Sequence, residues 1–176
     1  MGPAFYIAGA IAVLSTMMVI TRYNIMHALL YFIVSLLSVA VVFYLYGAPF
    51  MAALEVIVYA GAIMVLIIFF VMMLNLGPQT AGDEARWLTP RIWIGPSILC
   101  VVLLAELVYL ILQPTGAAAG DVITVDPKAV GKSLFGPYIL AVELAGMLLM
   151  AGIVGAYHLG RQKKKILHRF LERTDV

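Results

Sequence analysis

The chain has 176 residues, of which 64% are hydrophobic and 11% are charged, and its net charge is +2. A soluble domain usually has about 25% charged and about 45–50% apolar residues. This composition excludes an ordinary water-soluble globule, and it leaves no room for a large soluble domain or for a nucleic-acid-binding fold with a basic face.

Five apolar runs, taken in chain order, predict five membrane-spanning helices. Each run is near or above the roughly 20 residues that a bilayer requires, and a segment in lipid must be helical because a helix satisfies its own backbone polar groups. The runs cover residues 3–20, 27–46, 50–75, 91–112 and 138–158. We therefore expect an all-α membrane domain over residues 1–160, with Gly- and Pro-punctuated connections at residues 21–26, 47–49, 76–90 and 113–137.

The distribution of Lys and Arg predicts the orientation of these helices. One side of the membrane has only Lys128 and Lys132. The other side has nine basic residues: Arg22, Arg86, Arg91, Arg161, Lys163, Lys164, Lys165, Arg169 and Arg173. The positive-inside rule therefore places the N-terminus outside and the C-terminus in the cytoplasm.

Residues 161–176 form a basic cytoplasmic tail. Apolar residues recur in it at helical spacing, at Ile166, Leu167, Phe170 and Leu171. This pattern predicts a short amphipathic helix, which either touches anionic lipid as a topology anchor or docks onto a partner subunit.

Three carboxylates interrupt the apolar runs, at Glu55, Glu106 and Glu143. Acidic residues within a span are costly and often mark ion or proton paths. At a rise of about 1.5 Å per residue, each lies roughly 8–9 Å from the outer end of its helix. One hypothesis is a protonatable layer near the outer face. The alternative is that each acid separately meets interfacial water or a neighbouring subunit.

The third apolar run carries the most local information. Its 26 residues would extend about 39 Å as an α-helix, against a hydrocarbon core of about 30 Å, so it must tilt, kink or change its winding. Tyr59 shares a helix face with Glu55, as Tyr109 does with Glu106. Gly61, between two alanines, permits local distortion, for example a π-bulge, or alternatively a plain packing contact.

The sequence predicts no chemistry of its own for this chain. It has no G-x-G-x-x-G motif, and the G-x-x-x-G pattern at residues 116–120 lies in a predicted loop. The single cysteine, Cys100, excludes an internal disulfide and a thiolate cluster. His27 and His158 lie near helix ends, where interfacial positions explain them better than haem ligation does. We expect no catalytic site, no metal and no redox centre.

Several segments resemble subunit J of bacterial NADH:quinone oxidoreductase, respiratory complex I. They are HALLY at 27–31, ALEVIVYAGAIMVL at 53–66, VMMLN at 71–75, WIGP at 93–96, LFGPY at 134–138 and AVEL at 141–144. The resemblance covers about the first 160 residues, and the tail is outside it. It implies five transmembrane helices and no cofactor on this chain, with FMN, iron–sulfur clusters and quinone handled by other subunits. The partners it implies are the quinone-site and antiporter-like subunits of the membrane arm, in the bacterial cytoplasmic (inner) membrane.

The resemblance also implies a role for the third helix. In the family this helix has a π-bulge that converts to α-helix and so opens or closes a hydrated proton path. The matching positions here are Glu55, Tyr59, Gly61 and Val65, with Met64 and Phe69 on the turns that would rotate.

Two other classes of protein remain as alternatives. One is a subunit of a multi-subunit cation/proton antiporter or membrane-bound hydrogenase. The other is a free-standing channel or transporter, which the lack of an internal repeat and of a charged central pathway disfavours.

Overall fold

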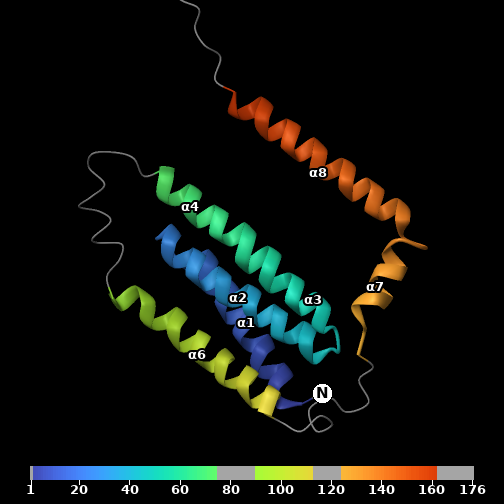
Figure 1. The fold of residues 1–176 in the computed structure, drawn as a ribbon. Helices are drawn as coiled ribbons and strands as arrows, with labels where there is room; N and C mark the ends of the chain where they lie inside the picture. Colours follow the sequence, from blue (N-terminus) through green and yellow to red (C-terminus); the bar gives the residue numbers. More distant parts are fainter. Residues whose placement is uncertain (1, 75–89, 113–123, 162–176) are drawn as a thin grey trace, which may run out of the picture. The chain divides into compact units, whose positions relative to one another are not determined.

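The computed structural model describes residues 2–74, 90–112 and 124–161. These residues form helices and no strands, and five of the helices are long and apolar enough to cross a membrane (Figure 1). The chain divides into two compact units, one through residue 127 and one from residue 128 onward, and each is described by itself.

The first two helices, α1 (Pro3–Thr21) and α2 (Ile25–Leu45), pair through a short turn. Pro3 occupies the first position of α1, where its missing N–H costs nothing. Asn24 caps α2, because its side-chain oxygen accepts hydrogen bonds from the backbone N–H groups of Met26 at 2.9 Å and His27 at 3.4 Å. The cap ends the connection and returns the chain antiparallel to α1.

Hydroxyl groups join α1 and α2 within their contact. Ser38 is fully buried and donates to the carbonyl of Ala8. One turn away, the Ser35 hydroxyl donates to the Ala12 carbonyl at 3.3 Å and lies 2.8 Å from the Thr16 hydroxyl. Small polar residues of this kind let two membrane helices approach closely and add interhelical hydrogen bonds.

A glycine turn joins α2 to the third span. Gly47 has φ of 76°, a left-handed conformation that glycine adopts without strain. Its N–H donates to Tyr44, and the N–H of Ala48 donates to Phe43, each at 3.0 Å. These two bonds form a Schellman motif, which satisfies the last carbonyls of α2. Pro49 then starts the next helix at its first position.

The third span is one continuous helix made of three segments, of which the first and last are α-helical and the middle one is π-helical. It consists of α3 (Pro49–Leu54), the π-helix η1 (Glu55–Ile63) and α4 (Met64–Leu74). The fourth span is α6 (Pro90–Leu112). Helix α2 is central to the unit, since it contacts α1, α3, η1, α4 and α6. Residues of α1, α2 and α6 form the buried apolar cluster: Ala8, Ile11, Val34, Val41, Leu103 and Leu110.

The second unit contains α8 (Ile139–Gly160) and, apart from its first residue, α7 (Pro127–Leu134). The short helix α7 lies within the predicted connection at residues 113–137. It was not predicted, because its eight residues include Lys128 and Lys132 and do not form a long apolar run. The predicted amphipathic helix of the tail lies outside the described residues.

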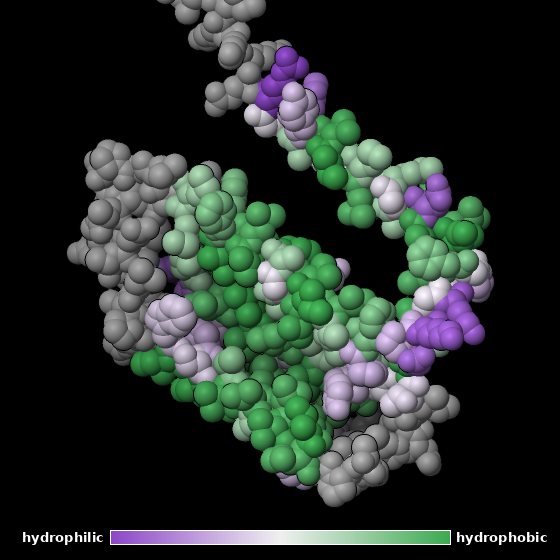
Figure 2. Space-filling view, in the orientation of Figure 1, coloured by the Kyte–Doolittle hydropathy of each residue, from purple (hydrophilic) through white to green (hydrophobic). Residues whose placement is uncertain are grey.

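The surface of the helices is strongly apolar. Figure 2 shows hydrophobic residues covering most of the visible face of the first unit. Many large apolar side chains are more than half exposed, among them Val13, Leu66 and Leu104. An exposed apolar surface of this extent is typical of a protein whose helices face lipid or other subunits.

Candidate functional site

The candidate site is the π-helical segment in the middle of the third span. The helix is α-helical on both sides of η1, and within η1 its hydrogen bonds reach back five residues. At the end of the segment, for example, the N–H of Met64 bonds to the carbonyl of Tyr59. This is the winding that the family resemblance implies for these residues. Such segments are rare in proteins, and those that occur are often located at functional sites.

Gly61 is placed where the wide turn brings two parts of the backbone together. A Cβ atom at this position would lie 3.1 Å from the carbonyl oxygen of Val56, five residues earlier. That distance is tight, so any side chain larger than hydrogen would require the carbonyl to shift by a few tenths of an ångström. Position 61 is therefore a tight site in the π-wound backbone.

The residues after Gly61 divide into one buried side chain and several exposed ones. Met64 is fully buried, at 0% exposure, and it belongs to the part of the third span that packs on α2. Val65 is 60% exposed and Phe69 is 59% exposed. Met64 thus lies on the packed face of the helix, while Val65 and Phe69 are largely exposed.

Glu55 and Tyr59 lie within η1, with Glu55 as its first residue. Glu55 is partly exposed and Tyr59 is 52% exposed. The side-chain hydrogen bonds found among the described residues all lie in α1, α2 and the turn between them, so none joins Glu55 to Tyr59. The predicted pair shares a segment without a direct bond.

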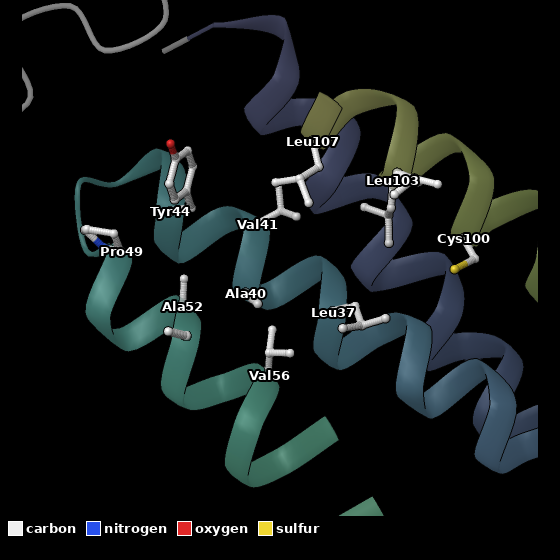
Figure 3. Close-up of a pocket in the computed structure, with 12 residues that line it drawn as sticks. Leu37, Ala40, Val41, Tyr44, Pro49, Ala52, Val56, Cys100, Leu103 and Leu107 are labelled. Carbon is white, nitrogen blue, oxygen red and sulfur yellow. The ribbon is translucent and has the colours of Figure 1, made fainter. Parts of the chain in front are cut away.

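An apolar groove lies beside the start of the π segment, between α2, α3 and α6 (Figure 3). Its volume is about 460 Å³. Val41 of α2, Leu103 and Leu107 of α6, and Ala52 and Val56 of the third span line it. None of its lining residues is charged, so the groove suits hydrocarbon and not an ion. Val56 belongs to both the groove and η1, so the groove borders the π segment directly.

The other two intramembrane acids have different surroundings. Glu106 on α6 is buried at 8% exposure, whereas Glu143 on α8 is exposed. Glu143 belongs to the second unit, so the predicted layer of three carboxyls stays a prediction. Tyr109, which shares a face with Glu106 in the sequence pattern, is 59% exposed. Among the described residues, no group of three or more His, Cys, Asp or Glu side chains is placed to hold a metal ion.

A cluster at the start of α2 was not predicted from the sequence. Tyr31 is buried, and its ring lies 5.0 Å from the ring of His27 and 5.6 Å from the guanidinium of Arg22. Its hydroxyl lies against Gly95 of α6, where a Cβ atom would overlap it. A glycine next to Pro96 inside a span was the one available sign of a close contact.

Comparison with known proteins identifies close relatives. The family model described as NADH-ubiquinone/plastoquinone oxidoreductase chain 6 matches residues 15–159. The NADH-quinone oxidoreductase subunit J of Pseudomonas aeruginosa is 60% identical over 163 residues, which cover 92% of this chain and 98% of that protein. Subunit J of Escherichia coli is 55% identical over 161 residues, 92% of this chain and 87% of that protein. Subunit J of Buchnera aphidicola subsp. Schizaphis graminum is 45% identical over 160 residues, 91% of this chain and 98% of that protein.

Proposed function

The chain belongs to the NADH-ubiquinone/plastoquinone oxidoreductase chain 6 family, and on that basis we propose that it is subunit J of a proton-translocating NADH:quinone oxidoreductase. It acts as a multi-pass subunit of the membrane arm, next to the quinone-site and antiporter-like subunits. FMN, the iron–sulfur clusters and quinone belong to other subunits, and this chain contributes to the coupling of electron transfer to proton movement.

The proposed location is the bacterial cytoplasmic membrane, with the N-terminus outside. The support is the unequal distribution of basic residues along the sequence, because Lys and Arg concentrate in the connections and tail that would lie in the cytoplasm. Arg22 follows α1 and Arg161 follows α8, so two of the helix ends assigned to the cytoplasm carry a basic residue directly after the helix.

The proposed mechanism is a change in winding of the third span. The π winding of Glu55–Ile63 carries this proposal. When a π segment rewinds as α-helix, the residues that follow it rotate about the helix axis. A shift of one residue corresponds to a rotation of about 100°. Tyr59, Val65 and Phe69 would then present their side chains in a different direction, and this would make or break a hydrated path that starts near Glu55.

The burial of Met64 supports this proposal, because it indicates which side chains the rotation would exchange. A π turn contains one more residue than an α turn. If the helix before η1 stays in place, rewinding to α moves each later residue forward along the helix, into the position that the next residue occupies in the π winding. Ile63, now 43% exposed, then takes the place of the fully buried Met64. Both side chains are apolar and of similar size, so the two windings bury comparable surfaces against α2. Two conformations can both be populated only if their free energies are similar, and similar burial in both windings meets this requirement.

The decisive experiment is to determine the winding of residues 55–63 in the assembled complex, at rest and during turnover. The proposal expects π winding in one state and α winding in the other. π winding in every state would overturn it. A functional test is Val65→Trp, which we expect to lower NADH oxidation coupled to quinone while oxidation by an artificial acceptor stays intact. Loss of both activities would mean failed assembly, and the amount of assembled complex separates these results.

A further inference from the structure

Glu106 is enclosed by the contact of α6 with α1 and α2. It is 8% exposed, and it lies on the same stripe of α6 as Leu103 and Leu110, three residues before it and four after it. Both of those leucines belong to the buried cluster formed with α1 and α2. Within the described part of the chain, neither carboxyl oxygen of Glu106 has a hydrogen-bond partner. The side chain is thus a polar group among apolar ones.

The helices packed on α6 offer no cation to this carboxyl. Helix α1 contains no Asp, Glu, Lys, Arg or His, and α2 contains only His27. His27 lies far from Glu106 along the helices. Tyr31, one turn after His27, contacts α6 at Gly95. Gly95 precedes Glu106 by eleven residues, or about 16 Å of helix. The tyrosines that α1 and α6 carry near this level, Tyr6 and Tyr109, are exposed.

Tyr44 of α2 and the hydroxyl of Ser38 are also not partners of Glu106. Tyr44 is 43% exposed and lines the groove beside α3. Ser38 donates its proton to the Ala8 carbonyl. Ser15 of α1 is buried and its hydroxyl also lacks a partner, so it does not bond to Glu106. Among the residues that the structure describes, the surroundings of Glu106 therefore supply no positive charge and no hydrogen bond to its carboxyl.

A buried carboxylate in such surroundings is strongly unfavourable, because an unpaired charge away from water loses its hydration without gaining a partner. A proton on the carboxyl removes that charge and is small enough to bind without any space being opened in the packed cluster. We propose that Glu106 is a proton-binding site, separate from the third-span path, and that it carries its proton at neutral pH. The proton is taken up from water and returned to water.

The site is independent of the proposed winding gate. Glu106 lies on α6, whereas the gate lies on the third span, and its occupancy is read from a carboxyl signal and not from turnover. A failure of the gate proposal would leave the spectroscopic expectation for Glu106 unchanged, and the reverse also holds.

Infrared spectroscopy of the intact purified complex tests the proposal. The spectrum of the unmodified complex minus that of the E106Q complex, at neutral pH, is expected to show the C=O stretching band of one protonated carboxyl per complex. That band should shift in D₂O. A difference containing the two bands of an ionised carboxylate instead would overturn the proposal.

A second variant keeps the test decisive. E106L carries the side chain of its neighbours Leu103 and Leu110, so it suits the apolar stripe, and it adds no amide carbonyl to the spectrum. The same band is expected in the difference against E106L. If the protonated-carboxyl band is missing from the difference spectrum of whichever variant assembles, the proposal is wrong.

Discussion

The carbonyl oxygen of Val56 lies so close to Gly61 that a Cβ atom on the glycine would be 3.1 Å away from it. The two residues are five apart, which is the hydrogen-bonding interval of a π-helix. The contact therefore belongs to the π winding itself. We expect a side chain at position 61 to change the balance between the two proposed windings.

We predict that Gly61→Ala shifts the third span toward α winding. The added methyl crowds the Val56 carbonyl in the π winding, and relieving the contact by a small bond-angle distortion costs about 1 kcal/mol. A cost of this size alters the ratio of two states about fivefold. Quinone-coupled NADH oxidation should fall, and oxidation by an artificial acceptor should persist. The winding itself is to be determined in the structure of the variant complex.

Gly9→Ala is the matched control for this substitution. Gly9 lies inside α1, and a Cβ atom there meets nothing within 4 Å. We expect this variant to keep both activities. Equal loss in the two variants, or an unchanged π winding together with full activity in Gly61→Ala, would show that position 61 does not control the winding.

The substitution Ile63→Trp is predicted to hold the third span in its π winding. Ile63 is 43% exposed in this structure, so a larger side chain has space. In the α winding the indole would have to enter the buried place of Met64, and overpacking of that kind typically costs about 1–3 kcal/mol. Coupled turnover should fall while assembly stays normal, with η1 still π-helical in the variant.

Leu66→Trp separates this effect from a general effect of bulk. Leu66 is 67% exposed and lies on the same helix, three residues further along. Its substitution should reduce turnover less than Ile63→Trp does. The reverse order would contradict the proposed one-residue exchange of Ile63 and Met64.

Sequence periodicity and length predicted the spans, because their apolar runs are long and are interrupted by Gly, Pro and capping residues. The third span shows how far this reasoning reaches. Its excess length and Gly61 indicated an irregularity, but they did not fix its type or its bounds, since π and α windings use the same apolar residues. The π winding was implied only by the family resemblance.

The burial of individual side chains could not be predicted from the sequence. Glu55, Glu106 and Glu143 have similar estimated depths, yet the structure leaves Glu55 partly exposed, buries Glu106 and exposes Glu143. Depth follows from counting residues along one helix, whereas burial depends on which face the neighbouring helices cover. The contact of Tyr31 with Gly95 was hidden for the same reason, because it joins two helices far apart in the sequence.

The three intramembrane acids are to be replaced separately by glutamine, which keeps the shape of the side chain but cannot carry a negative charge. If Glu55 begins the proton path, Glu55→Gln should lower the number of protons moved per NADH oxidised, whereas NADH oxidation with an artificial acceptor should continue. Proton uptake in sealed vesicles measures the ratio. Unchanged ratios for Glu55→Gln, Glu106→Gln and Glu143→Gln would exclude a role of a protonatable layer in proton transport.

The contact between α2 and α6 leads to a prediction about stability. Gly95→Ala places a methyl group into the Tyr31 hydroxyl, and an overpacked contact of this kind costs about 1–3 kcal/mol. We therefore expect less assembled complex and a lower thermal stability. Tyr31→Phe removes the hydroxyl but leaves the ring carbon that bore it 3.1 Å from the new Cβ atom, so the double variant should recover part of the loss and not all of it. The two substitutions must then be non-additive, as expected for residues in direct contact. Strictly additive losses of stability would show that α2 and α6 do not meet at this pair.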